Sequence, residues 1–310
     1  MASLKEVKTR ISSVNSTRKI TSAMKMVASS KLHRAQQAIE SMRPYQSRLD
    51  HITATFVSHL EGEVDTPYAV QREVRRVAIV LYTSNSSLCG AFNGNAIKAF
   101  THKCDELKNQ GVEIAKVYPI GKKATDAVRK AGFTDIEDYS KMLDHPAYAP
   151  ASALAAELMD KFEQGIYDQV LLIYHHFQST SKQVLTEEVF LPVQLDNTPV
   201  QSEEQSVSTI RNNYIVEPSV ESLLQNLIPK SLHLKVYTAL LDSLASEHAA
   251  RIVAMQVATD NADELLRQLT LTYNKTRQQA ITTELLDIVG GAASSFSICS
   301  STWFSRSFQS

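Results

Sequence analysis

Apolar residues near the start of the chain recur at alternating intervals of three and four. Of the seventeen positions met in this way between Leu4 and Leu60, twelve are apolar, which is the heptad pattern of a coiled coil. No Gly occurs before Gly62, and Pro44 is the only Pro that could kink a helix here. The pattern predicts one helix over residues 1–60, about 85–90 Å long at the α-helical rise per residue.

The heptad seam is interrupted in the middle of this helix. Three successive seam positions are polar, namely Arg18, Thr21 and Lys25. The apolar face moves there to Ile20, Met24 and Val27, as a stutter in a coiled coil would do. We therefore expect this part of the helix to serve a partner outside the coiled coil.

A second long heptad segment occupies the C-terminal part of the chain. Between Ser219 and Val289 there is no Gly and a single Pro, and steps of seven from Leu227 to Thr276 meet mostly apolar residues. Because Gly is common directly after a helix, Gly290-Gly291 predicts that the helix covers residues 218–291. Two long heptad helices at opposite ends of one chain most simply form an antiparallel coiled coil. Residues 292–310 are Ser-rich without heptads, and we expect them to be disordered.

The middle of the chain alternates between strand and helix patterns. Apolar, β-branched runs predict strands at residues 74–83, 113–121, 167–176 and 182–193. Helical stretches lie near residues 95–110, 122–131 and 151–164. This alternation is typical of a partly parallel, doubly wound sheet. We expect an α/β domain over residues 70–195, inserted between the two arms of the coiled coil, with the polar residues 196–217 as an exposed connection.

Charge is segregated along a chain whose composition is otherwise ordinary. The 310 residues are 43% hydrophobic and 21% charged, with a net charge of −1. Residues 1–48 hold ten Lys and Arg against two Glu, or +8, which leaves −9 for the remainder. The cations between Glu6 and Glu40 are Lys8, Arg10, Arg18, Lys19, Lys25, Lys31 and Arg34. A helix of one sign is often a solvated face, but it also suits an acidic partner.

The cysteines and the hydropathy of the chain indicate which cellular compartment it occupies. The three cysteines Cys89, Cys104 and Cys299 form no CxxC, which argues against a disulfide framework and for a reducing compartment. No apolar run approaches the roughly 18 residues that span a bilayer. The start, MASLKEVKTRIS, lacks the apolar core of a secretory signal. It is basic and amphipathic, so a mitochondrial transit peptide is an alternative, although the same periodicity runs on far beyond it.

A doubly wound sheet invites an enzyme interpretation, but the sequence lacks the motifs for it. There is no GxGxxG, GxxxxGK[ST] or GxSxG. His175 and His176 are neighbours on a strand and point to opposite faces. His102 and Cys104 lack a second pair at ligand spacing. Cys89 follows a strand with no His or Asp marked as its partner, which indicates a structural thiol. We expect no catalytic residue, no cofactor and no metal.

Three segments resemble the γ subunit of F-type ATP synthases. They are STRKITSAMKMVASSKL near the start, SSLCGAFN after the first predicted strand, and residues 243–292 from SLASEHAARIV to the two glycines. The resemblance covers residues 1–292 in order. Two departures stand out. Asn85, Ser86 and Ser87 replace the family's Asp-Arg-Gly, whose Arg helps the rotor catch on a catalytic β subunit. The chain also continues past the family's usual end with residues 294–310.

The resemblance implies a rotating shaft, present once per complex, in the central stalk of the synthase. Its coiled coil would pass through the hexamer of α and β subunits, and its α/β domain would sit on the c-ring and hold the ε subunit. It would contact the membrane only through the c-ring, on the cytoplasmic face of a bacterial plasma membrane or, alternatively, on the matrix face of the mitochondrial inner membrane. Nucleotide would be bound by the hexamer. The chain itself would be non-catalytic.

The resemblance also assigns contact residues. Those expected to meet β subunits are Arg18, Met24, Lys25, Arg251, Arg277, Gln278, Thr282 and Glu284. Those expected at the c-ring are Tyr214, Val216 and Glu217. From the residues alone two other functions stay open. One is a rod-like coiled-coil adaptor that binds an acidic partner or, through its basic arm, the phosphates of a nucleic acid. The other is an α/β enzyme with coiled-coil arms.

Overall fold

The computed structural model describes residues 3–57, 66–193 and 220–306, and for residues 291–306 it describes the course of the backbone alone. The chain divides into two compact units. One consists of Met1–Met24 with Met255–Ser310, and the other of Lys25–Ala254. The predicted connection at residues 196–217 lies outside the described ranges.

Two long helices carry the heptad segments, as predicted. They are α1, Leu4–Val57, and α6, Val220–Arg306, and each continues through the Pro inside it. The predicted helix end at Gly290-Gly291 is wrong, because α6 runs through both glycines to Arg306. Residues 292–306 of the predicted disordered tail are helical, and its last four residues lie outside the described ranges. Gly inside a helix costs only about 1 kcal/mol relative to Ala. Since no Pro follows the two glycines, nothing in the sequence forces the helix to stop there.

The two helices run antiparallel. In the unit Lys25–Ala254, Leu32 of α1 shares a buried cluster with Ala245 and Ala249 of α6. Phe56, further along α1, is buried in the same cluster as Leu224, near the start of α6. Residue numbers therefore fall along α6 as they rise along α1, and the predicted antiparallel coiled coil is confirmed.

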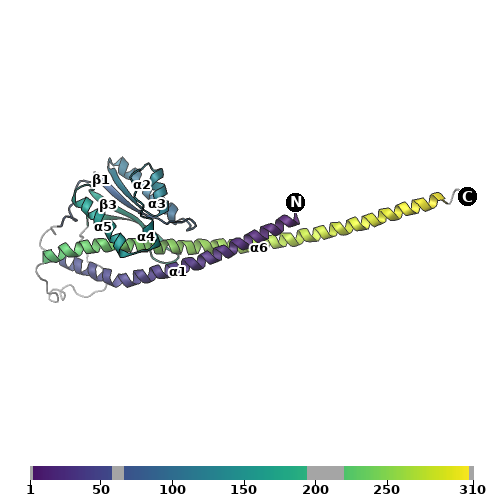
Figure 1. Cartoon of the computed structure of the whole chain (residues 1–310), viewed down its shortest axis with the longest axis horizontal. Coiled ribbons are helices and arrows are strands. Elements are labelled where there is room, and N and C mark those ends of the chain that lie inside the picture. The colour runs from purple at the N-terminus through teal and green to yellow at the C-terminus, as the bar shows by residue number, and fades with distance from the viewer. Residues whose placement is uncertain (1–2, 58–65, 194–219, 307–310) are drawn as a thin grey trace. The chain divides into compact units, whose positions relative to one another are not determined.

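The α/β domain, in which Figure 1 labels β1 and β3, is built on a four-stranded sheet of order β2-β1-β3-β4. The strands are β1 (Arg76–Tyr82), β2 (Glu113–Ile120), β3 (Gln169–Phe177) and β4 (Gln183–Leu191). β1 pairs in parallel with β2 and β3, and β4 is antiparallel to β3. The four predicted strands are confirmed, because their β-branched, apolar residues fill a sheet that is covered on both faces.

Helices cover both faces of this sheet. The helices are α2 (Phe92–Asn109), α3 (Lys122–Lys130), the short α4 (Lys141–Asp144), which the sequence did not predict, and α5 (Tyr148–Glu163). Alternate residues of β1 point to opposite faces. Val80 and Tyr82 lie in the core shared with α5 and α6, whereas Ile79 and Leu81 lie in the core shared with α2 and α3.

The order of the strands creates a switch point at the carboxyl ends of β1 and β3. From β1 the chain goes through α2 to β2 on one side, and then returns through α5 to β3 on the other side of β1. In doubly wound sheets a ligand commonly binds in the crevice outside these strand ends. The switch point is therefore the first place to look for a functional site.

Candidate functional site

Side chains of α6 occupy the switch point. Arg251 donates from Nη1 to the carbonyl oxygen of Ser87 at 2.6 Å and from Nη2 to Oγ of Ser86 at 2.9 Å. Its third partner is Oε1 of Glu247, one turn earlier on α6, at 2.6 Å from Nη2. Arg251 and Glu247 are 8% and 7% exposed. The loop after β1 is thus bound to a helix of the same chain where a doubly wound enzyme would bind its ligand.

The same loop is also held from its other side. Asn85 donates from Nδ2 to the carbonyl oxygen of Ser140 at 3.0 Å and to Oδ1 of Asp144 at 3.1 Å. Its Oδ1 accepts from the backbone N–H of Lys122, at the start of α3. Leu88 at the tip has a positive φ of 69° and is 60% exposed. Asn85 and the two serines, which depart from the family's pattern, therefore have partners inside this chain.

Two imidazoles, that of the buried His175 and that of the half-buried His248, have no hydrogen-bond partner for Nδ1 among the described residues. His175, at the end of β3, is 3% exposed and stacks on Phe92, with ring centroids 4.4 Å apart. His248 lies on α6 itself. Burial lowers the pKa of each imidazole to about 4. Both imidazoles are therefore uncharged at neutral pH. Neither can act there as a protonated general acid.

The described residues provide no metal centre and no activated thiol. No three His, Cys, Asp or Glu side chains among them come together as a metal site would require. Cys89 is 1% exposed, with Sγ 3.1 Å from Nδ2 of Asn93. Burial raises the pKa of Cys104 to about 11, which removes its reactivity as a thiolate. Both cysteines pack as structural residues.

In the unit Met1–Met24 with Met255–Ser310, polar residues continue the seam between α1 and α6. Nη1 of Arg18 lies 2.9 Å from Oδ1 of Asp263. The hydroxyl of Thr21 lies 2.8 Å from that of Thr259, and Thr21 is 8% exposed. The predicted stutter is therefore wrong, because Thr21 stays in the seam by bonding to Thr259.

The predicted apolar face of the stutter lies outside the seam. Ile20 and Val27 are 59% and 58% exposed, and Met26 between them is 70% exposed. Met24 and Lys25 are partly buried. The part of α1 between Glu6 and Glu40, which has no acidic residue, thus combines exposed apolar side chains with its cations.

The remaining predicted contact residues divide into two groups. Arg277, Gln278, Thr282 and Glu284 are all exposed on α6, and the hydroxyl of Thr282 donates to the carbonyl oxygen of Gln278. Large apolar side chains on the same stretch are exposed as well, with Leu286 at 66% and Ile288 at 67%. Tyr214, Val216 and Glu217 lie outside the described residues. Arg251 differs from all of these because it is buried.

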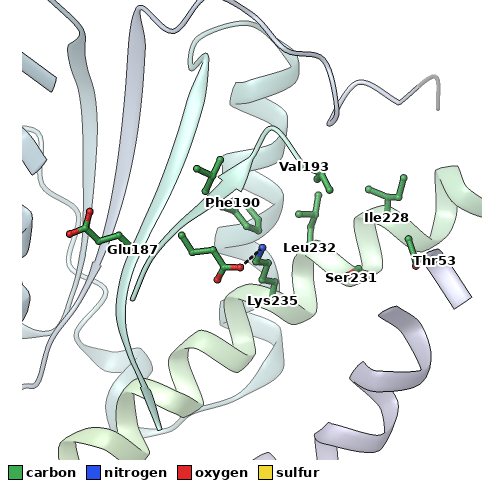
Figure 2. A pocket seen from close by; sticks show the side chains of 10 residues that line it. Thr53, Glu187, Phe190, Val193, Ile228, Ser231, Leu232 and Lys235 are labelled. Atoms are coloured by element: carbon green, nitrogen blue, oxygen red, sulfur yellow. Dashed lines mark ion pairs between the residues drawn. The ribbon is translucent and has the colours of Figure 1, made fainter. Parts of the chain in front are cut away.

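A cavity of about 490 Å³ lies away from the switch point, between β4, α6 and α1 (Figure 2). Phe190 and Val193 line one wall, and Ile228 and Leu232 of α6 line the other. An ion pair of 2.8 Å between Glu188 and Lys235 crosses it. The cavity adjoins an edge strand and contains no group set up for catalysis.

Comparisons with known proteins decide the family. A family model described as ATP synthase matches residues 3–294. An ATP synthase gamma chain of Phocaeicola vulgatus is 55% identical over 292 residues, which are 94% of this chain and 99% of that protein. The chain belongs to the ATP synthase γ chain family. A gamma chain of Flavobacterium johnsoniae is 46% identical, over 94% of this chain and 98% of the relative.

Solved structures agree with the fold. A chain in a cryo-EM structure of the mitochondrial ATP synthase of Euglena gracilis, which contains OSCP, F1 and the c-ring, superposes with a TM-score of 0.62 at 20% identity, over 94% of both chains. A central-stalk chain from Tetrahymena thermophila gives 0.54 at 24% identity, over 77% of this chain and 99% of the other. At such identities the likeness concerns the fold. The alternative of a rod-like adaptor receives no support from these relatives.

Sequence reasoning missed the switch-point contacts. It assigned Arg251 to a partner subunit, whereas the structure gives this guanidinium three partners within the chain. A buried Arg with a Glu four residues earlier on the same helix was the available signal, since such pairs face each other. The pairing of Arg18 with Asp263 joins residues 245 positions apart, and no local pattern indicates it.

Proposed function

We propose that this chain is the central-stalk rotor of an F-type ATP synthase. It transmits the proton-driven rotation of the c-ring to the catalytic hexamer of α and β subunits, and in the reverse direction transmits the rotation driven by ATP hydrolysis. The observation that carries the proposal is the family match over residues 3–294, joined to the two antiparallel helices that such a shaft requires.

The chain acts as a mechanical element and catalyses no reaction. Support comes from the switch point, where Arg251 and Glu247 of α6 stand in the place of a ligand. A buried ion pair with hydrogen bonds to Ser86 and Ser87 is difficult to displace, because removing one partner leaves the other charge buried. The loop that would cradle a phosphate instead fixes the α/β domain to the shaft.

Contact with the catalytic subunits would use two surfaces. One is the part of α1 between Glu6 and Glu40, which has no acidic residue and includes Arg18, Met24 and Lys25. There, charge and flexible apolar side chains can form and re-form contacts with acidic loops of successive β subunits. The other is the exposed stretch of α6 with Arg277, Gln278, Thr282 and Glu284. Arg251 would act indirectly, by fixing the loop at residues 85–88.

The partners and the location follow from the same proposal. The complex contains one copy of this chain with the α and β subunits, the ε subunit and the c-ring. No helix of the described residues is long and apolar enough to cross a membrane. The curated relatives named above are bacterial. We place the chain at the cytoplasmic face of the plasma membrane, held there through the c-ring, with Tyr214, Val216 and Glu217 as foot residues.

The direct test is reconstitution of the full chain with its α, β and ε subunits. We expect a stoichiometric complex whose ATP hydrolysis drives proton pumping in membranes that contain the c-ring. Met24→Lys should assemble but uncouple pumping from hydrolysis, because an added cation at the β loops forms an ion pair that must break three times per turn. Thr101→Lys, at an exposed position of α2, is the matched control. Release of the chain from nucleic acid by salt, without association with α and β, would contradict the proposal.

A further inference from the structure

Three charged side chains of α6 contact the α/β domain at successive points along the helix. Nζ of Lys235, labelled in Figure 2, lies 2.8 Å from Oε1 of Glu188 on β4. Oδ2 of Asp242 lies 2.5 Å from Nδ1 of His176, near the end of β3. Arg251 binds the loop after β1. At 1.5 Å per residue these contacts span about 24 Å of α6, and they fix β4, β3 and the loop to one helix.

The contact of Asp242 lies where α1, α6 and the sheet meet. A cavity of about 340 Å³ there has Arg43 of α1, His176 of β3 and Asp242 of α6 in its walls. Burial raises the pKa of the Asp242 carboxyl, and the positive charges of His176 and Arg43 oppose this rise. The carboxylate therefore stands between a cation of the α/β domain and a cation of α1.

The two members of the ion pair differ in their access to water. The side chain of Asp242 is 16% exposed, whereas that of His176 is 47% exposed. A buried carboxylate depends on its cations, because an unpaired buried charge is costly. Imidazole is the side chain that ordinarily changes its charge between roughly pH 5 and 8, and an exposed ring exchanges its proton with water. The carboxylate therefore has both cations in mild acid and loses that of His176 as the pH rises.

The other charged and titratable groups around His176 belong to types that keep their charge over this range. They are Arg43 on α1, Tyr174 on β3, Glu188 on β4 and Lys235 on α6. The side chains of Arg, Lys and Glu ordinarily stay ionised between roughly pH 5 and 8. Burial raises the pKa of the Tyr174 phenol, which keeps it protonated. His176 is therefore the group that changes the charge around Asp242 near neutral pH.

We propose that His176 and Asp242 form a pH-sensitive contact that fixes the α/β domain to α6, with Arg43 of α1 as the constant second cation. Both are positioning residues, which hold the domain against the shaft and take part in no reaction. The contact is strong below neutral pH and weaker above it, whereas the contacts of Lys235 and Arg251 keep their charges. The inference concerns the chain by itself, and the proposed function enters only in that the fixed domain would then turn with the shaft.

A double-mutant cycle in the full chain tests this proposal. The variants are His176→Val, Asp242→Ala and the two together, compared by urea unfolding followed by circular dichroism. Val suits a strand, and neither change creates a new polar contact. We expect the two positions to be coupled about tenfold in the unfolding equilibrium constant at about pH 6, and about threefold or less at about pH 9, where a neutral imidazole still donates one hydrogen bond. Equal coupling at both pH values, or no coupling at either, overturns the inference.

The pair of Lys235 and Glu188 supplies a matched control, because it joins the same helix to the same sheet without a His. The cycle of Glu188→Val with Lys235→Ala should give a coupling that is the same at both pH values. A coupling that falls for both pairs would reflect a general loosening of the domain at high pH, which contradicts the role given to His176.

His176→Lys tests the imidazole directly. It replaces the titrating cation by one that ordinarily keeps its charge, so the coupling of position 176 to Asp242 should stay within about twofold between the two pH values. A coupling of the Lys variant that still falls as in the unaltered chain contradicts the inference. Association with α and β subunits is measured separately. A chain with pH-dependent coupling that fails to join them supports this inference and contradicts the proposed function.

Discussion

Arg251 donates from Nη2 to Oε1 of Glu247 at 2.6 Å, and this buried pair joins α6 to the loop that follows β1. Burial raises the pKa of Glu247, and the neighbouring guanidinium opposes this rise. The charged pair is stabilised further because the hydroxyl of Ser86 and the carbonyl oxygen of Ser87 accept two more guanidinium N–H groups. The α/β domain is therefore fixed to the shaft by a polar contact in which each member depends on the others.

Arg251→Met should destabilise the unit Lys25–Ala254 strongly. The variant leaves the Glu247 carboxylate buried without its cation, and breaking such pairs costs about 3–5 kcal/mol. Urea unfolding of the full chain, followed by circular dichroism, measures the loss. Arg251→Met with Glu247→Gln should recover most of it, because no buried charge remains.

The matched control for that pair is exposed. Arg267 pairs with Glu264 on α6 with both side chains largely in solvent, so Arg267→Met should leave the unfolding midpoint nearly unchanged. Equal losses from Arg251→Met and Arg267→Met would show that the buried position has no special role.

The buried imidazoles predict acid sensitivity. A base whose pKa is lower in the folded than in the unfolded protein lowers stability as the pH falls, because the unfolded chain binds the proton more readily. For His175 the window runs from the ordinary value of 6.5 down to about 4, and the loss across it is at most about 3 kcal/mol. His248 adds a second contribution of the same sign.

Unfolding free energies measured between pH 7 and 4 test this expectation. His175→Phe keeps the ring against Phe92 without a titrating group, so its stability should fall less steeply with acid than that of the unaltered chain. His102→Gln, at an exposed position, is the control and should keep the full slope. A His175→Phe variant with an unchanged slope would mean that His175 does not titrate on unfolding in this range.

The strands and the long helices could be predicted because each has its own local sequence pattern. Runs such as VAIVLY are apolar on both faces of the strand, as is needed in a sheet that α2, α3, α5 and α6 cover on both sides. The long helices were readable from heptads. Thr21 was misassigned because polarity alone places a Thr outside a seam, whereas its hydroxyl is satisfied by Thr259. The loop partners of Arg251, Ser86 and Ser87, were unpredictable because they lie more than 160 residues away along the chain.

Variants of the ion pair between Arg18 and Asp263 distinguish a structural role of Arg18 within the chain from a role in binding a β subunit. Exposed ion pairs contribute about 0.2–1 kcal/mol, so Arg18→Asp alone should change the stability of the chain little. The exchange of Arg18→Asp with Asp263→Arg restores opposite charges within the chain but places an acid where an acidic β loop is expected. We expect normal stability and reduced ATP-driven proton pumping. The exchange of Lys103→Glu with Glu106→Lys on α2 is the control. Full pumping by the first exchange would limit Arg18 to a structural role.

The isolated chain should bind no nucleotide. The switch point is filled by Arg251 and Glu247, and the sequence has no Gly-rich phosphate loop. Titration calorimetry with Mg-ATP should show no saturable binding to the monomeric full chain, whereas the hexamer of α and β subunits, measured in parallel, should bind. A micromolar affinity of the isolated chain would contradict the assignment of the switch point to a mechanical contact.

Removal of residues 294–310 should shorten a helix without stopping the rotor. α6 continues to Arg306, so the truncated chain should lose the circular dichroism of about thirteen helical residues, counted from 294 to 306. The family match ends at residue 294, and the gamma chain of Phocaeicola vulgatus is covered over 99% of its length by the matched part. The family's shared machinery therefore lies before the deleted residues, and ATP hydrolysis and proton pumping of the reconstituted complex should stay within about twofold of the full-length values, a difference of less than 0.5 kcal/mol in activation free energy. A large rise in hydrolysis would instead identify the extension, with Trp303, Phe304 and Phe308, as a brake on the catalytic head. Failure of the truncated chain to assemble would give the extension a structural role.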